Sequence, residues 1–493
     1  MAFTSVSFVF LFLPITIILY YLLPKIAYKN ILLVILSLLF YAWGDKNFIY
    51  LFIISIFVNY CFGLLFDKYK NKFINKIFVF LMIVWNFGIL YYFKYLIFTV
   101  NSINSIADLT LTVPNIITPL GISFITFRAV SYCLDVFFQA CSASRNPINV
   151  ALYITFFPQV IMGPITKYYE FEPQINKREF SLDNFTEGIE RFIIGLAKKI
   201  LIADSIAPMV NTIFTMEASE RTVVLAWIGA LGYLIQLYFD FSGYSDMAIG
   251  IGKMLGFKTP ENFNYPYMSR SAVEYWSRWH ITLGTWVKDY IYVPVYRAMS
   301  NKQNIFTHQK FSVAVSDSIA LFLVWLFIGF WHGAGYAFLL HGMYWFFFIF
   351  LERRYDAYKK AKRKKLKIKR QALTRNEKIL AHIYFIIILF FSQTLFRIAD
   401  VTEWIDYSKN MIGLMGAGLL DDYAVINLID NLVLIIAGIF FSFPIGKYIA
   451  DKFKEKNQTA FIFSKYTVLL ILFCFSILWV ISGTNNSFIY FQF

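Results

Sequence analysis

Two histidines lie in segments that are too polar or too interrupted to be ordinary membrane-spanning helices. His332 follows Trp331 and precedes Gly333 in the run WHGAG, and His280 lies in the run SRWHITLG. A neutral imidazole shielded from water can accept a proton from a hydroxyl, because desolvation disfavours its charged form. Each histidine also fits a structural role, in which it only makes one hydrogen bond between helices. These residues alone leave both roles open.

A third polar segment, residues 236–256, places Asp240, Ser242 and Asp246 among apolar residues. Gln236 and Asp240 are four residues apart, so they share one face of a helix. Asp240 or Ser242 is a candidate cap for a helix whose N-terminal end faces a polar cavity. Both acids fit equally well as caps or as buried ion-pair partners. Ionisable groups persist at membrane depth only where protein buries them or where they line a water-filled cavity.

The segment that contains His280 is expected to form a helix that lies at, or dips through, a membrane interface. Ser271 and Glu274 have the spacing of a capping box, which predicts the start of this helix. Gly284 and Pro294 are expected to interrupt or end it. Its many tryptophan and tyrosine residues are typical of a membrane interface.

The segment around His332 is too long for one spanning helix. Without a break, residues 317–351 would extend about 50 Å at 1.5 Å per residue, whereas the apolar slab is about 30 Å thick. Gly333 and Gly335 are the natural break. Basic residues on both sides predict a hairpin with cytoplasmic ends and His332 at its apex. The return arm, residues 336–351, would extend only about 24 Å, so the apex should lie inside the membrane.

The composition indicates that most of the chain lies in a membrane. Of 493 residues, 59% are hydrophobic and only 15% are charged, whereas about a quarter of a soluble domain is charged. Apolar runs of about 20 residues recur along the whole length. We therefore expect an all-α polytopic membrane protein with about ten to twelve transmembrane helices. Outside the central region, spans are expected near residues 3–23, 31–44, 48–66, 77–100, 379–396, 428–450 and 468–481.

The charge distribution predicts the orientation. Residues 353–378 contain 13 Lys and Arg against two acids, Asp356 and Glu377. By the positive-inside rule this segment is expected to be a basic cytoplasmic loop, which places the N-terminus outside the cell. A basic run could bind nucleic acid, but the flanking spans favour an orientation signal that touches anionic lipid headgroups. Residues 379–493 are expected to form C-terminal helices.

Other familiar chemistries have no support in the sequence. The four cysteines are scattered and lack the spacing of a disulfide framework or a metal site, and no GxSxG, Walker or HExxH motif occurs. His341 comes nine residues after His332, so on a continuous helix it would lie on the opposite face. We therefore expect His341 to be structural, and we expect no metal and no nucleic-acid partner.

Several segments, taken together and in order, resemble the membrane-bound O-acyltransferase (MBOAT) family. They are SLLFYAWGDKNFIYLFIISIFVNY at 37–60, PLGISFITFRAVSYCLDV at 119–136, FFPQVIMGPITKYYEFEPQI at 156–175, YFDFSGYSDMAIGIGKMLGF at 238–257, WSRWHITLGTWVKDYIY at 276–292 and FWHG at 330–333. The resemblance implies one membrane-embedded domain over residues 1–493 with a core at about 119–351. It also implies a ring of helices, with re-entrant and interfacial helices, around a central funnel in a thinned membrane.

The resemblance implies that His332, in the WHG motif, is central to catalysis, and that His280, in the RWH motif, also has a role. His332 is expected to act as a general base on a hydroxyl, while His280, Trp279 or backbone N–H groups are candidates to stabilise an oxyanion. A covalent acyl-enzyme step stays open. The residues expected to line the funnel or to orient the site are Trp279, Arg278, Asp240, Ser242, Asp246, Trp331 and Gly333.

Within the family the chain is most similar to the alginate O-acetyltransferase branch. This similarity implies a protein of the bacterial cell membrane that moves an acyl group, expected to be acetyl, from a cytoplasmic thioester such as acetyl-CoA or an acyl carrier. The acceptor would be a secreted or cell-surface polysaccharide, reached directly or through an extracytoplasmic acetyltransferase or a polysaccharide-synthesis protein, and no cofactor would stay bound. One alternative is D-alanyl transfer from a carrier protein to teichoic acid. Another is a lipid-linked glycan transporter, although no internal repeat is visible.

Overall fold

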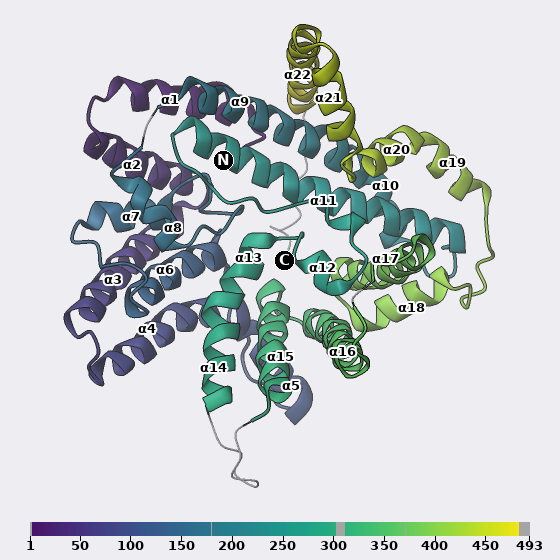
Figure 1. The fold of residues 1–493 in the computed structure, drawn as a ribbon, viewed down its shortest axis with the longest axis horizontal. Helices are drawn as coiled ribbons and strands as arrows, with labels where there is room; N and C mark the ends of the chain where they lie inside the picture. Colours follow the sequence, from purple (N-terminus) through teal and green to yellow (C-terminus); the bar gives the residue numbers. More distant parts are fainter. Residues whose placement is uncertain (1, 179, 302–310, 370, 483–493) are drawn as a thin grey trace. The chain divides into compact units, whose positions relative to one another are not determined.

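The computed structural model describes residues 2–178, 180–301, 311–369 and 371–482, so the end of the expected C-terminal region, 483–493, lies outside the described residues. Every regular element in this part of the chain is a helix (Figure 1). Seven of these helices are long and apolar enough to cross a membrane, and one bent pair would make an eighth. The all-α polytopic class is confirmed, whereas the expected ten to twelve spans are not.

The chain divides into two compact units, and the expectation of one membrane domain stays a prediction. The first unit comprises the described residues of Met1–Leu196, Gly243–Glu261 and Leu472–Gly483. Its helices are η1 (Phe8–Phe12), α1 (Leu13–Leu22), α2 (Ile26–Gly44), η2 (Lys46–Phe48), α3 (Ile49–Lys68), α4 (Ile74–Leu90), η3 (Tyr91–Tyr95), α5 (Leu96–Ala107), α6 (Ile122–Phe137), α7 (Pro147–Thr155), α8 (Tyr168–Ile175) and nearly all of α9 (Leu182–Ala197).

The second unit comprises Ala197–Ser242 and Asn262–Ile471 among the described residues. The long helix α11 (Val223–Met254) begins in this unit and continues into the first, and most of α22 (Gln458–Ile481) belongs here. The other helices are η4 (Lys198–Asp204), α10 (Ser205–Thr215), η5 (Pro266–Met268), α12 (Ala272–Trp276), α13 (Ile281–Val287), η6 (Lys288–Tyr292), α14 (Val293–Asn301), α15 (Val313–His332), α16 (Tyr336–Leu366), α17 (Arg375–Ile398), α18 (Val401–Met411), α19 (Asp422–Asp430), α20 (Leu432–Phe441) and α21 (Ile445–Lys456).

The predicted break at Gly333 is confirmed, and the two helices that flank it form a hairpin. Helix α15 ends at His332, α16 begins at Tyr336, and the two helices pack against each other. They come so close at Gly342 that a Cβ atom there would clash with the carbonyl oxygen of Trp325 and would lie 3.0 Å from Cα of Gly329. These two glycines therefore allow the backbones of the hairpin to touch.

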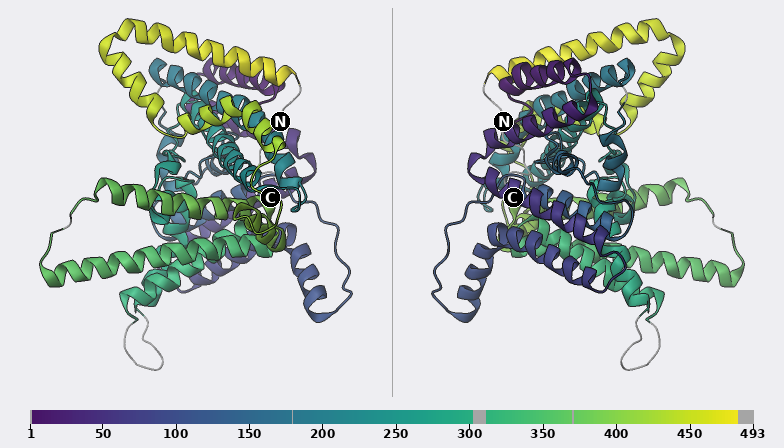
Figure 2. Two further views of the ribbon diagram at one scale, coloured as in Figure 1. Left: turned by 90° about the vertical axis from the view of Figure 1, so that its right-hand side faces the viewer. Right: turned by 90° about the vertical axis from the view of Figure 1, so that its left-hand side faces the viewer.

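The basic segment differs from its expected loop form. Helix α16 continues to Leu366 and packs against α17. Figure 2 shows the two green helices projecting together and spreading apart toward the ends that the chain connects. Ala, Leu, Lys and Arg are strong helix formers, so the segment extends a helix whose first half is already packed. Where α16 leaves the packed part, Asp317 forms ion pairs with Arg353, at 2.6 Å, and with Arg354.

The helix predicted from Ser271 is shorter than expected. Ser271 does cap it by accepting a hydrogen bond from the Glu274 amide, but α12 ends at Trp276. The chain then breaks at His280, which has a positive φ of 44°, before α13 begins. Gly284 lies inside α13, and Pro294 occupies the second position of α14, where proline is tolerated. Neither residue ends a helix.

Two further expectations were wrong. Asp240 and Ser242 lie inside α11, which runs unbroken from Val223 to Met254, so neither residue caps a helix. The span expected at 428–450 is divided, because α19 and α20 meet at a 57° bend and α21 is a separate helix beyond Pro444. The apolar run at 428–450 was therefore not sufficient to predict one unbroken helix.

Candidate active site

His332 lies in a buried aromatic cluster in the second unit. His332 is the last residue of α15 and is only 6% exposed. Its ring centroid is 4.7 Å from that of Trp331, 5.0 Å from that of Phe396 and 5.9 Å from that of His341. The rings of His332 and His341 are nearly perpendicular, at 86°. The break at Gly333 therefore brings together two histidines from consecutive helices.

His280 joins the same cluster through Trp331. The ring centroids of His280 and Trp331 are 6.1 Å apart, and Phe241 of α11 packs edge-on against His280 at 4.7 Å. The left-handed backbone of His280 is unusual for a residue with a side chain and carries a conformational cost of about 1–3 kcal/mol. The amide of Ile281 donates to the carbonyl of Asn262 at 3.0 Å, which helps to hold this backbone.

The hydrogen bonds around Asn262 determine the tautomer of His280. The Asn262 Oδ1 atom accepts from the amide and hydroxyl of Thr282, at 3.2 and 2.8 Å, and lies 3.1 Å from Nδ1 of His280. A carbonyl oxygen only accepts, so Nδ1 carries the hydrogen and Nε2 carries the lone pair. Among the described residues Nε2 is buried and has no hydrogen-bond partner. Burial also lowers the pKa of His280 to about 3, which keeps the ring neutral.

His341 has the complementary arrangement. The indole Nε1–H of Trp345 donates to Nε2 of His341 at 3.1 Å, so Nδ1 of a neutral His341 carries the hydrogen. This Nδ1–H is buried and has no partner in the described part of the chain. Counting residues from His332 missed this placement, because helical periodicity does not continue across the break at Gly333. The break itself was the signal that could have found it.

The neighbours of the histidines have structural contacts. Gly333 faces the ring of Phe338 so closely that any Cβ atom would overlap it. Trp279 is buried and packs edge-on against Phe263 at 5.0 Å. Arg278 forms an ion pair with Glu274, at 3.0 Å. Trp331 and Gly333 thus belong to the His332 cluster, and Trp279 adjoins His280. Arg278 lies in the turn after α12 and is held by Glu274 of that helix.

Asp240 belongs to a buried ion cluster. The ammonium group of Lys199, in η4, lies 2.6 Å from a carboxylate oxygen of Asp240 and 2.6 Å from one of Asp204. Burial alone would lower the pKa of Lys199, but the two carboxylates raise it, so its charge is retained. Ser242, two residues after Asp240, is also buried, and its hydroxyl has no hydrogen-bond partner among the described residues. Asp240 is therefore an ion-pair partner, as one of the two sequence interpretations proposed.

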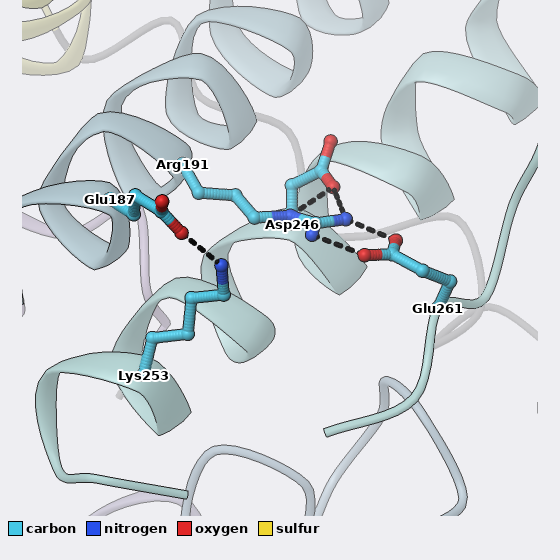
Figure 3. Close-up of polar contacts among 5 residues, drawn as sticks. All are labelled: Glu187, Arg191, Asp246, Lys253 and Glu261. Atoms are coloured by element: carbon cyan, nitrogen blue, oxygen red, sulfur yellow. Dashed lines mark hydrogen bonds and ion pairs between the residues drawn. The ribbon is translucent and has the colours of Figure 1, made fainter. Parts of the chain in front are cut away.

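Asp246 lies in the part of α11 that belongs to the first unit. Figure 3 shows Arg191 between Asp246 and Glu261, and Lys253 paired with Glu187. One nitrogen of Arg191 is 2.9 Å from Asp246, and another is 2.5 Å from Glu261. Asp246 is therefore also an ion-pair partner, in a cluster distinct from that of Asp240.

The histidine cluster presents complementary hydrogen-bonding groups in a buried setting. His280 offers a lone pair at Nε2, His341 offers an N–H group at Nδ1, and the His332 ring lies in contact with the rings of Trp331 and His341. No group of three or more His, Cys, Asp or Glu side chains suited to a metal ion occurs among the described residues. Such an arrangement suits proton transfer at a hydroxyl and stabilisation of a polar transition state.

Comparisons with known proteins agree with this chemistry. The chain is 40% identical to a probable alginate O-acetylase of Azotobacter vinelandii over 72% of its length and 70% of the relative. It is 31% identical to a peptidoglycan O-acetyltransferase of Helicobacter pylori over 85% of its length and 81% of the relative. It is 33% identical to the teichoic acid D-alanyltransferase of Bacillus subtilis, but over only 47% of its length and 58% of the relative.

The strongest assignment comes from the family itself. Residues 48–394 match the model of the membrane-bound O-acyltransferase family, and this range includes all three histidines of the cluster. The matched range covers well over half of the chain. The protein therefore belongs to the membrane-bound O-acyltransferase family.

Proposed function

We propose that this O-acyltransferase moves an acetyl group from a cytoplasmic thioester, such as acetyl-CoA, to hydroxyls of a secreted or cell-surface polysaccharide. The observation that carries the proposal is the buried cluster of His332, Trp331 and His280. The activities of two relatives, a probable alginate O-acetylase and a peptidoglycan O-acetyltransferase, support the acetyl group and a glycan acceptor. The acceptor is reached directly or through an extracytoplasmic partner protein.

In the proposed reaction His332 is the general base. As the acceptor oxygen attacks the thioester carbonyl, its proton moves to the imidazole of His332 and a tetrahedral oxyanion forms. The intermediate then collapses, the carbon–sulfur bond breaks, and the proton passes from His332 to the leaving thiolate. The products are an ester and a free thiol, so no oxidant, reductant or bound cofactor is consumed.

The tautomer of His280 suits a different role from the oxyanion donor considered from the sequence. Its Nε2 atom carries a lone pair, which would repel an oxyanion while the ring is neutral. We assign His280 to accept a hydrogen bond from a second donor on the substrates, such as a neighbouring sugar hydroxyl. That contact would orient the acceptor, while Trp279 would support the ring of His280 from the adjacent position.

The proposed topology follows the positive-inside rule. The basic half of α16 would lie in the cytoplasm, the apex at His332 would lie within the bacterial cell membrane, and the N-terminus would face outward. The thioester would then approach from the cytoplasm and the acceptor from outside, with the helices forming a ring around a funnel. Arg278, Asp240, Ser242 and Asp246 would support the funnel wall and would not react.

The test is mass spectrometry of surface polysaccharides from cells that carry the wild type or His332→Ala at equal membrane abundance. We expect ester-linked acetyl groups to disappear from one glycan in His332→Ala. The control is His382→Gln, because His382 lies outside the cluster and contacts the carbonyl of Ser269 at 2.8 Å. Unchanged acylation in His332→Ala would contradict the proposal and would favour the transporter alternative.

A second candidate function is D-alanyl transfer from a carrier protein to teichoic acid. The B. subtilis relative favours it, although that similarity covers less than half of the chain. The same spectra separate the two functions. Loss of ester-linked D-alanine, with acetyl groups retained, would select this candidate.

A further inference from the structure

We propose that His341 is a third catalytic residue, which donates a hydrogen bond from Nδ1–H to the carbonyl oxygen of the thioester as that oxygen becomes an oxyanion. This inference rests on the proposed function and adds a residue and a role to the same site. Its basis is a buried hydrogen-bond donor beside the proposed base, with a tautomer fixed by Trp345.

The first argument is the cost of an unpaired buried donor. His341 is 2% exposed, and its Nδ1–H has no partner among the described residues. Leaving such a group unpaired costs about 1–3 kcal/mol, so most buried donors in proteins are paired. A donor that persists unpaired beside a reactive residue fits a partner that arrives with the substrate.

The second argument is the fixed tautomer. Without Trp345, a neutral imidazole could place its hydrogen on either nitrogen. The indole N–H of Trp345 occupies Nε2, at 3.1 Å, and therefore keeps the hydrogen on Nδ1. Trp345 itself is fully buried and stacks on Tyr275 at 5.3 Å, so its indole is held in place. Trp345 is thus a positioning residue, since it acts through His341.

The third argument is proximity to the proposed base. The rings of His332 and His341 are 5.9 Å apart between centroids, and the ring of Phe396 packs against both, at 5.0 and 5.2 Å. A thioester carbonyl that reacts beside His332 would therefore also lie close to His341. His341 and His280 suit different roles, because His341 offers a hydrogen-bond donor at Nδ1 and His280 offers an acceptor at Nε2.

The test compares His341→Gln with His341→Met at equal membrane abundance. Glutamine and methionine have similar length and volume, but only glutamine offers an N–H group. We expect His341→Met to lose about 100-fold or more of the acetyl transfer rate, the usual effect of removing one oxyanion donor, and His341→Gln to retain most of that rate. The rate is measured as ester-linked acetate formed on the glycan over time.

Trp345→Phe supplies an independent readout. It removes the indole N–H while preserving an aromatic ring, so we expect the maximal rate to fall several-fold with KM for the acyl donor unchanged. Its control is Tyr344→Phe, at the residue that precedes Trp345. This change removes the hydrogen bond that the Tyr344 hydroxyl donates to the carbonyl of Ile388, at 2.9 Å, and leaves the contacts of His341 unchanged. Wild-type rates in Tyr344→Phe and reduced rates in Trp345→Phe support the fixed tautomer.

The outcomes separate this inference from the proposed function. If His332→Ala abolishes transfer while His341→Gln and His341→Met behave alike, the donor role of His341 is overturned and the proposed function stands. If His332→Ala keeps wild-type transfer, the proposed function is wrong and this inference falls with it.

Discussion

At the scale of single residues, Asn262 controls the chemistry of His280 through one atom. Its Oδ1 accepts the hydrogen on Nδ1, and burial lowers the pKa of His280 to about 3, so the lone pair on Nε2 is available at every ordinary pH. A carboxylate in place of the amide would favour the imidazolium form and would raise this pKa toward the ordinary value of about 6.5. Protonation would then remove the lone pair.

We therefore expect Asn262→Asp to make acetyl transfer sensitive to acid. Transfer in the variant should fall as the pH decreases through the raised pKa of His280, whereas His280 should cause no such loss in the wild type above about pH 3. The measurement is the rate of acetyl transfer across pH 5–8 in membranes. Asn457→Asp is the matched control. The Oδ1 atom of Asn457 accepts a hydrogen bond from the exposed amide of Ala460, and a carboxylate oxygen at this position can accept the same hydrogen bond. Identical pH profiles for Asn262→Asp and wild type would contradict the role assigned to His280.

Residue types and spacing predicted only part of this site. The sequence pointed to His332 and His280, because each occurs in a polar interruption of an apolar region. It could not indicate Asn262, whose hydrogen bond to His280 is made across a broken backbone. It also did not single out Trp345, which bonds to His341 one turn away on the same helix. It also misplaced His341, because helical counting assumes a helix that does not break.

At the scale of helices, the contact between α15 and α16 positions His332 and His341. The contact depends on Gly329 and Gly342, whose backbones touch. Small residues at a membrane helix interface allow this approach, and van der Waals packing then holds the pair. Overpacking such a contact costs about 1–3 kcal/mol.

Gly342→Ala should therefore lower the thermal stability of the detergent-purified protein and reduce acetyl transfer. The added methyl group would meet the carbonyl of Trp325, so the helices must separate and the two histidines must move. Gly88→Ala is the control, because a Cβ atom at Gly88 meets nothing within 4 Å and alanine favours a helix by about 0.5–1 kcal/mol. A melting temperature for Gly342→Ala equal to or above that of Gly88→Ala would refute this account.

A helix boundary could be predicted where the length of the segment allowed only one position for a break. Residues 317–351 were too long for one span, which required the break at Gly333. The break at His280 had no comparable signal, because a left-handed histidine depends on contacts from Asn262. Asp240 and Ser242 resembled caps because their types favour caps, but the apolar packing of α11 carries the helix through them.

At the scale of the whole molecule, α17 is a candidate span between two exposed regions, the basic end of α16 and the connection after α18. One span places its ends on opposite sides of a membrane. The positive-inside rule assigns the α16 end to the cytoplasm, so residues near Leu414 should be outside.

This topology can be measured by thiol labelling in a variant whose four cysteines are replaced. In cells with an intact plasma membrane, an impermeant maleimide should label Leu414→Cys and should label Lys362→Cys only after lysis. Both positions are exposed, so access depends on the side of the membrane. Labelling of Lys362→Cys before lysis would reverse the proposed orientation.

Helix α16 also has a mechanical consequence. It contains 31 residues, about 46 Å at 1.5 Å per residue, and it carries His341 near one end and the basic side chains at the other. A continuous helix of this length is stiff, so a displacement of one end is carried toward the other. We therefore expect a molecule that binds the basic end to shift the position of His341, so that binding far from the site would change the rate of transfer.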